Sequence, residues 1–345
     1  MNTADAYLII LGNQAGDLDS TVCTLSLASL LSSDSNENTI PLLRGVLDDF
    51  RLKPEIPAIL DYAGIKRGTL IFDYHPASED GYFLVDHNIP EESMPTLPVR
   101  GIIDHHMDGG YDVTLPLRII ESCGSCASLV CREWYKRGRV PDRTNALLLA
   151  AAIIVDTGNF DPQWGKTTEI DTTQFARLEK LINSEDLAFL KTLPAIKNDL
   201  HHLSACDHLK RDYKDIRTSQ LKGGITTVPL SIKDYFSPAF YSAKGVEDFI
   251  QKEELDLFFI MHTLRNPFGR ELSFKISPSH SQREELENRI KKTLCSLPEV
   301  SLVAADQPYG NTYGWFHYRQ KNSKASRKIL LPLINGMMEE IGADL

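Results

Sequence analysis

The sequence predicts a two-domain α/β protein, in which a mostly parallel, helix-covered sheet is followed by a smaller α/β domain. The chain has 345 residues, which is long for one core when domains usually hold about 100 to 200 residues. In the first half, short apolar runs alternate with stretches of helical spacing, a pattern typical of parallel sheets covered by helices. A polar stretch from Asn183 to Lys222 then interrupts this alternation.

The first domain is expected at residues 1–190. Ala6 to Leu11 is an apolar run that predicts a strand ending at Gly12, and Ser20 to Leu31 has the apolar spacing of a helix. Further strands are expected at Leu70–Phe72, Tyr82–Val85, Val99–Ile103 and Leu117–Ile120, and helices at Cys126–Arg137 and Arg143–Ile154. In sheets of this kind ligands bind beyond the carboxyl ends of the strands.

Residues 191–222 have weak apolar periodicity and are interpreted as a linker with helical pieces. The linker carries His201, His202 and His208, which lack strand-end placement and are not expected to be ligands. Residues 223–345 form the second domain. Its strands are expected at Thr226–Ile232, Leu255–Leu264, Glu271–Ile276 and Tyr313–Arg319, and its helices at Val246–Glu253, Gln282–Cys295 and Arg327–Ile341.

Composition and charge limit the function classes. The longest apolar run, Ala146 to Val155, is half the length of a membrane-spanning helix, and no secretion signal is evident, so we expect a cytoplasmic protein without membrane contact. Six cysteines in so long a chain indicate reduced thiols, and the lone Cys123/Cys126 pair is interpreted as a loop leading into a helix. The net charge of −10 argues against nucleic acid as a partner, although a polyanion could bind at a locally basic site.

Acidic residues follow the first predicted strand. Asp17 and Asp19 lie two residues apart on a loop between a strand and a helix, where their carboxylates can point into one site for Mg²⁺ or Mn²⁺. The alternative is that Asp19 or Ser20 only caps the helix.

Two later strands and one helix end in similar clusters. Asp86 ends one strand, Asp104-His105-His106 follows the next, and Asp156 lies where an apolar helix runs out. Each cluster alone could be a turn, but strand ends of a parallel sheet converge on one crevice. Four acidic positions along the chain with one or two imidazoles are what a two-metal hydrolytic site needs.

The order of these motifs resembles the DHH phosphoesterases. The Ala325-Ser326-Arg327-Lys328 stretch is similar to the basic signature of the second (DHHA2-type) domain shared by family II inorganic pyrophosphatases and eukaryotic exopolyphosphatases. Gly12 to Ser20, Gly124 to Leu129 and Leu209 to Lys214 look closest to the exopolyphosphatase branch. The resemblance implies an active site in the cleft between the domains.

The resemblance also implies roles for single residues. Asp17 and Asp86 would hold one metal ion, and Asp19, Asp86, His105 and Asp156 the other. Asn13 stands where pyrophosphatases of this type carry His, so its place among the ligands is open. The resemblance assigns substrate contacts to His106, Lys214, Arg327 and Lys328. The neighbouring Lys210, Arg211, Lys321 and Lys324 could extend a track for a longer polyanion; Arg265 and Arg270 are weaker candidates that could simply be solvated.

The function expected from this resemblance is that of a monomeric exopolyphosphatase that releases orthophosphate from the ends of inorganic polyphosphate. Two divalent cations would serve it, Mg²⁺ first, with Mn²⁺ or Co²⁺ as alternatives. The rival enzymes are an inorganic pyrophosphatase and a prune-like short-chain polyphosphatase or cyclic nucleotide phosphodiesterase. A non-catalytic polyphosphate sensor is the rival from another class.

Overall fold

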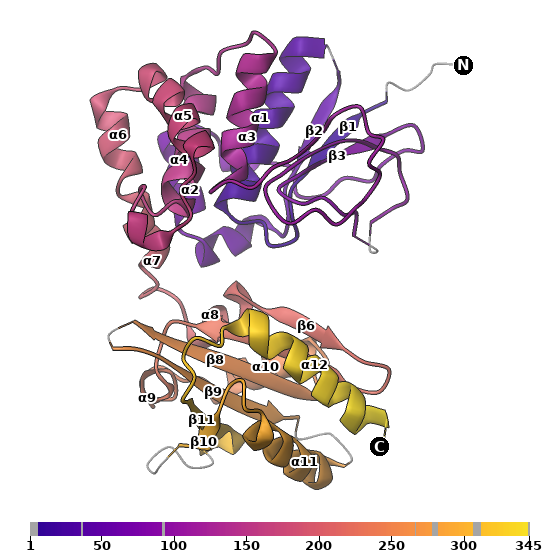
Figure 1. Ribbon diagram of the computed structural model, residues 1–345, viewed down its shortest axis with the longest axis vertical. Coiled ribbons are helices and arrows are strands. Elements are labelled where there is room, and N and C mark those ends of the chain that lie inside the picture. Colours follow the sequence, from indigo (N-terminus) through magenta and orange to yellow (C-terminus); the bar gives the residue numbers. More distant parts are fainter. Residues whose placement is uncertain are drawn as a thin grey trace. The chain divides into compact units, whose positions relative to one another are not determined.

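The computed structural model describes residues 6–35, 37–91, 94–265, 267–277, 282–305 and 312–343. The side chains of Arg265 and Lys328 lie outside this description. The chain divides into two compact units, Met1–Leu200 and His201–Leu345, which are described separately (Figure 1).

The first unit is built on a five-stranded parallel sheet. Its order is β2-β1-β3-β4-β5, formed by β1 (Leu8–Leu11), β2 (Thr39–Leu42), β3 (Gly81–Val85), β4 (Val99–Asp104) and β5 (Arg118–Ile120). Side chains alternate along β1, because successive residues of a strand point to opposite faces. Leu8 and Ile10 therefore enter one core, while Ile9 and Leu11 enter another.

Helices cover one face of this sheet and loops cover the other. The helical face is packed by α1 (Leu18–Ser35), α3 (Cys126–Lys136) and α4 (Arg143–Asp156), as Figure 1 shows. The second face is covered by loop side chains, among them Tyr74, Leu97 and Tyr111. The unit also contains α2 (Glu55–Tyr62), α5 (Glu169–Leu178), α6 (Ser184–Leu190), α7 (Leu193–Asn198) and the 3-10 turns Leu47–Leu52, Arg67–Thr69, Pro162–Trp164 and Glu179–Leu181.

The expected strand at Leu70–Phe72 is reduced to one bridge, between Leu42 and Ile71. A 3-10 turn, Arg67–Thr69, immediately precedes it, so little chain remains to pair with β2. The apolar run at Ala146–Val155 is buried throughout and forms most of α4, as expected of a core helix. No helix among the described residues is both long and apolar enough to cross a membrane.

The second unit is a six-stranded mixed sheet between two layers of helices. The order β10-β11-β9-β8-β7-β6 joins β6 (Lys214–Arg217), β7 (Lys222–Val228), β8 (Leu257–Arg265), β9 (Phe268–Ile276), β10 (Leu302–Ala304) and β11 (Phe316–Gln320). The β7–β8 pair is parallel and the other pairs are antiparallel. Part of the stretch interpreted as a linker thus forms β6, an edge strand.

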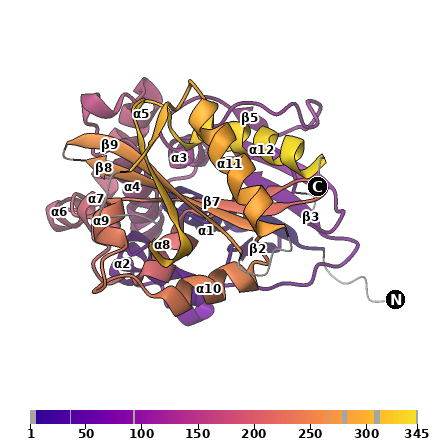
Figure 2. The ribbon, with the colours of Figure 1, turned by 90° about the horizontal axis from the view of Figure 1, so that it is seen from below.

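Alternating residues of β8 separate the two cores of this unit. Phe259 and Met261 face a core closed by α11 (Arg283–Ser296) and α12 (Arg327–Ala343), while Phe258 and Ile260 face the opposite layer. That layer consists of α8 (Ala205–Arg211), α9 (Ile232–Tyr235) and α10 (Ala243–Lys252), and Figure 2 shows both layers. Before β11, Thr312–Gly314 forms a 3-10 turn instead of the expected start of a strand.

Candidate metal centre

The loop between β1 and α1 carries Asn13 and Asp17. Asp17 Oδ1 accepts a hydrogen bond from the backbone N–H of Ser20 at 3.0 Å, so this carboxylate caps α1. The Asn13 side chain joins two partners: Oδ1 accepts from the Gly16 N–H at 3.1 Å, and Nδ2 donates to Asp86 Oδ2 at 2.6 Å. The capping alternative therefore applies to Asp17, not to Asp19 or Ser20.

Asp19 lies in the first turn of α1, and its carboxylate is held by the start of α3. Oδ2 accepts from the Cys126 N–H at 2.7 Å, while Oδ1 accepts from the Ala127 N–H at 2.9 Å and the Ser125 hydroxyl at 2.8 Å. The first N–H groups of a helix have no partner within it and favour an anion. Asp19 is thereby fixed in one orientation, with Oδ2 towards His105.

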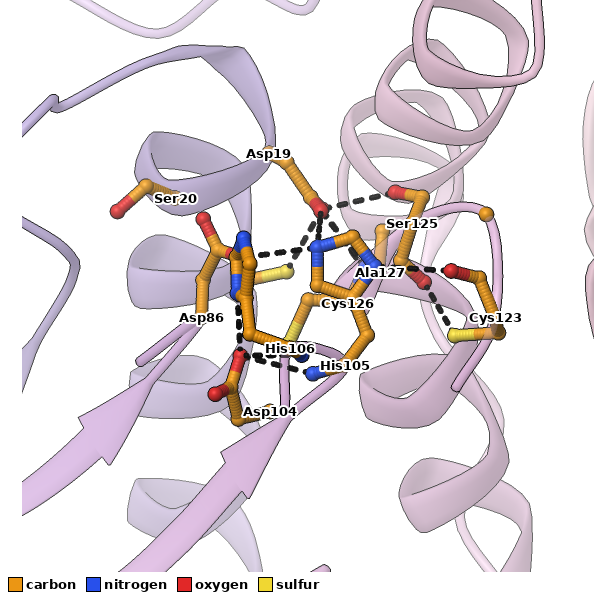
Figure 3. A network of polar contacts seen from close by, with 12 residues as sticks. Asp19, Ser20, Asp86, Asp104, His105, His106, Cys123, Ser125, Cys126 and Ala127 are labelled. Atoms are coloured by element: carbon orange, nitrogen blue, oxygen red, sulfur yellow. Dashed lines mark hydrogen bonds and ion pairs between the residues drawn. The ribbon is translucent and has the colours of Figure 1, made fainter. Parts of the chain in front are cut away.

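His105 presents its Nε2 atom to the carboxylates. Its Nδ1 lies 3.0 Å from the carbonyl oxygen of Cys123, a contact that requires the proton on Nδ1. Nε2 lies 3.3 Å from Asp86 Oδ1 and 3.8 Å from Asp19 Oδ2 (Figure 3). Burial lowers the pKa of His105, but contacts with Asp86, Cys123 and Asp19 outweigh it, so the pKa is raised. A proton and a metal ion would compete for Nε2.

Asp86 follows β3 and has only 2% of its surface exposed. Its φ angle of 63° is left-handed, a conformation that non-glycine residues rarely adopt and that is concentrated at functional sites. Oδ2 is bound by Asn13, whereas Oδ1 accepts no well-aligned hydrogen bond from any described residue. Burial and the charge of Asp19 raise the pKa of Asp86.

Asp156 is the last residue of α4. Its Oδ2 atom is buried and has no hydrogen-bond partner among the described residues. Burial raises the pKa of Asp156, and the negative charges of Asp19 and Asp17 raise it further. Asp156 therefore shares the electrostatic environment of the strand-end cluster.

These groups fit a divalent cation. Asp86 Oδ1 and Asp156 Oδ2 are buried and unsatisfied, and His105 Nε2 becomes a ligand once deprotonated. Ligand atoms of Asp86, His105 and His106 also lie within 4.8 Å of one another. Buried carboxylates without partners are costly unless a cation neutralises them. Oxygen ligands with one imidazole suit Mg²⁺, Mn²⁺ and Co²⁺, so the residues match the expected cofactors in kind.

His106 is positioned by Asp104 at the exposed edge of the cluster. Asp104 has no exposed surface, and its Oδ1 accepts from the backbone N–H groups of His105 at 2.8 Å and of His106 at 3.2 Å. The same oxygen is 2.8 Å from His106 Nδ1 (Figure 3). Asn88 donates a hydrogen bond to the other oxygen of Asp104. The His106 side chain is 56% exposed, although its Nδ1 is held by the buried Asp104.

Comparisons with known proteins give one domain match and several similar proteins. A DHHA2 domain matches residues 191–337. The chain is 28% identical to exopolyphosphatase PRUNE1 of Homo sapiens, over 94% of this chain and 74% of that protein. It is 25% identical to a Schizosaccharomyces pombe protein named as a candidate exopolyphosphatase, over 99% of this chain and 94% of that protein.

The chain contains a DHHA2 domain and is similar to exopolyphosphatases along nearly its whole length. Its fold is that of a candidate family II inorganic pyrophosphatase of Methanococcus jannaschii, whose crystal structure matches with a TM-score of 0.59 and 20% identity over 96% of this chain and 99% of that one.

The DHHA2 domain carries the basic candidates. Arg327 begins α12, where its Nη1 donates to the Asp212 carbonyl at 2.6 Å and lies 2.7 Å from Asp212 Oδ2. Lys214 begins β6, two residues after Asp212. The Leu209–Lys214 stretch and the Ala325–Lys328 stretch therefore meet within this unit. The remaining candidates differ in exposure: Lys210, Lys321 and Lys324 are exposed and Arg211 is half-buried, while the Lys328 side chain is outside the described residues.

Arg270 has a structural contact that its sequence does not indicate. Its Nε donates to the Ser323 carbonyl at 2.8 Å, and its Nη1 donates to the Thr263 hydroxyl at 3.0 Å. The first bond fixes the loop that leads into Arg327. Arg265, the other weak candidate, has a side chain outside the described residues.

Sequence reasoning assigned no role to several residues that organise the centre. Asp104 and Asn88 position His106, and the start of α3 orients Asp19. A signal existed for Asp104, which belongs to the strand-end cluster Asp104-His105-His106, and Asn88 lies two residues after Asp86. No local signal links Asp19 to α3, since Cys126 is 107 residues away in the chain.

Proposed function

We propose that the chain hydrolyses terminal phosphoanhydride bonds of inorganic polyphosphate and releases orthophosphate. It acts as a metal-dependent phosphoanhydride hydrolase. Support comes from relatives named exopolyphosphatase, which match nearly the whole chain, and from relatives named as manganese-dependent inorganic pyrophosphatases, which match part of it.

The observation that carries the proposal is that Asp86 Oδ1, 3.3 Å from His105 Nε2, and Asp156 Oδ2 are both buried without a well-aligned hydrogen-bond donor among the described residues. If these carboxylates served only to stabilise the fold, protein donors would satisfy their oxygens, as the His105 backbone N–H and the His106 ring do for Asp104. These two oxygens are instead suited to bind divalent cations. Such cations act as Lewis acids and lower the pKa of a bound water.

The residues around this position divide the remaining work. His106, whose Nδ1 is held by Asp104, would as an imidazolium donate a hydrogen bond from Nε2 to the phosphoryl group or to the leaving oxygen. Arg327, Lys328 and Lys214 neutralise phosphate charge, because guanidinium and ammonium groups stabilise the charge of the transferring phosphoryl group. Lys210, Arg211 and Lys324 bind the following phosphates of a longer chain.

Pyrophosphate is the second candidate substrate, and one observation bears on it. Asn13 replaces the His of the pyrophosphatase pattern and turns its Nδ2 towards Asp86. A weaker metal position penalises the smallest substrate most, because a longer chain adds phosphate contacts whose binding energy serves the reaction.

The test is phosphate release from long-chain polyphosphate, tripolyphosphate, pyrophosphate and cyclic AMP with Mg²⁺ or Mn²⁺, each with and without a chelator. We expect chelator-sensitive release that is fastest for the polyphosphates. Fastest release from pyrophosphate would identify a pyrophosphatase. Binding of polyphosphate without release, by a protein replete with metal, would identify a sensor and overturn the proposal.

A further inference from the structure

We propose that the two metal positions of this chain are unequal: one is preformed, and the other is closed by the Asn13 side chain until substrate phosphate arrives. The preformed position is centred on Asp86 Oδ1 and His105 Nε2, which lie 3.3 Å apart, and Asp19 and Asp156 are its other expected ligands. The closed position lies between Asn13, Asp17 and Asp86. The inference rests on the metal site of the proposed function, but it concerns occupancy before substrate binds.

The first step is the orientation of the Asn13 amide. Its oxygen accepts from the Gly16 N–H at 3.1 Å, and its nitrogen faces Asp86 Oδ2 at 2.6 Å and the Asp86 carbonyl at 3.4 Å. The reverse orientation would place NH₂ against an N–H and an amide oxygen against a carboxylate oxygen. Hydrogen bonding therefore selects the orientation that presents a donor, which cannot ligate a cation.

The second step is the distance itself. Two oxygens bound to one octahedral ion with bonds of about 2.1 Å stand about 3 Å apart. The 2.6 Å separation between Asn13 and Asp86 Oδ2 suits a charge-assisted hydrogen bond and is too short for two ligands of one ion. The Asn13 NH₂ group thus occupies the lone pair through which Asp86 would bridge to a second ion.

The third step concerns Asp17, the other expected ligand of this position. Its Oδ1 caps α1 through the Ser20 N–H. The Asn13 backbone N–H is held by the Ser20 hydroxyl at 2.7 Å, so the loop and its cap form one hydrogen-bonded unit. A second ion would have to break the Asn13–Asp86 bond within this unit.

The opposite side of Asp86 shows the contrast. Oδ1 is buried without a well-aligned partner, and His105 Nε2 lies 3.3 Å away with its tautomer set by Cys123. Asp156 adds a second unsatisfied oxygen. One carboxylate therefore has an oxygen prepared for an ion and an oxygen already bound. Phosphate oxygens of the substrate would supply the ligands that the closed position lacks.

The test measures Mn²⁺ binding without turnover. Chelator-treated, folded protein would be titrated with Mn²⁺ by calorimetry and by electron paramagnetic resonance. We expect one tightly bound, mononuclear Mn²⁺ in the wild type, with any second ion bound at least about tenfold more weakly. Adding the non-hydrolysable imidodiphosphate should bring in the second ion and produce a spin-coupled pair.

Asn13→His supplies a ligand and removes the donor, so this variant should bind two tight Mn²⁺ ions without imidodiphosphate. Gln14→His is the matched control, because it adds an imidazole at the adjacent exposed position and should leave the stoichiometry at one. Thermal unfolding checks that each variant is folded. Two equally tight ions in the wild type would overturn the inference, as would a single ion in a folded Asn13→His protein.

These outcomes are separate from the proposed function. If the protein binds one tight Mn²⁺ ion and hydrolyses none of the substrates, the inference about the metal positions stands and the proposed function is refuted. If the protein hydrolyses polyphosphate and binds two equally tight ions without substrate, the proposed function stands and the inference about the metal positions is refuted.

Discussion

Asp86 combines a rare backbone conformation with an unsatisfied charge, and these two properties can be tested separately. Its φ of 63° suits Asn as well as Asp, because both tolerate the left-handed region better than other non-glycine residues. Asp86→Asn should therefore leave the fold intact while removing the charge that is proposed to balance a metal ion. We expect a loss of turnover of roughly a hundredfold or more, measured as phosphate release under saturating Mg²⁺.

The control for this change is Asp73→Asn, which removes one negative charge at an exposed position. It should retain wild-type turnover. Near wild-type turnover in a folded Asp86→Asn protein would refute the metal assignment.

Arg327 presents a different problem, because its guanidinium already pairs with Asp212. If Arg327 stabilises charge as the phosphoryl group is transferred, Arg327→Ala should lower kcat by roughly ten- to a hundredfold as well as raise KM. Asp212→Asn removes the ion pair but keeps the arginine, and should change kcat little. Equal effects of both variants on kcat would indicate that Arg327 serves only to hold Asp212.

The sequence predicted that the strand-end side chains converge, but it did not predict their hydrogen bonding. The approach of Asp19 and Asp86 to His105 could be predicted, because the ends of neighbouring parallel strands meet at one edge of the sheet. The place of Asp156 among them stays a prediction. The amide orientation of Asn13 could not be predicted, because it depends on Asp86, 73 residues away. The capping role fell to Asp17 because its carboxylate, not that of Asp19, reaches the Ser20 N–H.

Among the elements, α3 is more than a packing helix, because its first N–H groups and the Ser125 hydroxyl hold Asp19. Ser125→Ala removes one of these bonds, and it should weaken Mn²⁺ binding about tenfold because oriented ligands bind metal more tightly. Ser128→Ala is the matched control, since this buried hydroxyl donates to Asp171 instead. Calorimetry on both variants decides the matter; equal affinities would show that the backbone N–H groups suffice.

A chain of buried side chains crosses three strands of the second sheet. His262 on β8 bonds through Nδ1 to the Leu230 carbonyl and through Nε2 to Ser273 on β9, whose hydroxyl also meets His317 on β11. Burial lowers the pKa of His262 to about 3 and that of His317 to about 4. Both therefore remain neutral where the unfolded histidines, with a pKa of about 6.5, become protonated.

The unfolded state thus binds more protons below about pH 6.5, so the stability contributed by these histidines is complete above that pH and is lost on acidification. Towards pH 4, each histidine should lower the free energy of unfolding by up to about 1.4 kcal/mol per pH unit. Denaturant unfolding between pH 7 and pH 4.5 would measure the slope. His317→Asn, which keeps a donor towards Ser273 but does not titrate, should flatten it; an unchanged slope would exclude His317.

Which elements could be predicted depended on their contacts. The central strands β8 and β9 are long, and their residues point alternately to the two faces of the sheet. The residues that enter each core can therefore be predicted from the sequence. β2 and β10, with four and three residues, are too short to show a period, and β6 lies in a polar stretch because it is an edge strand.

At the scale of the whole molecule, the net charge of −10 is unevenly distributed. Residues 201–345 carry 20 Lys and Arg against 18 Asp and Glu, so the excess negative charge belongs to the first unit, with 17 against 29. An acidic protein can therefore present a locally basic unit to a polyanion. The acidic unit suits cations, and the second unit contains Lys210, Lys321 and Lys324 at its surface.

This division predicts how salt affects the two candidate substrates. Long-chain polyphosphate would meet several exposed lysines, whose attraction is screened over about 10 Å at 0.1 M salt. Pyrophosphate engages mainly the metal ions and the residues nearest to them, where screening is weaker. Raising KCl from about 50 to 200 mM at constant free Mg²⁺ should therefore increase KM for long-chain polyphosphate several-fold and KM for pyrophosphate much less.

Lys324→Gln should reduce this salt dependence without changing kcat, because the side chain is exposed and is proposed to contact only phosphates beyond the reacting one. Equal salt dependence for both substrates would mean that the exposed lysines do not bind the chain, and that any preference for longer substrates arises at the metal centre.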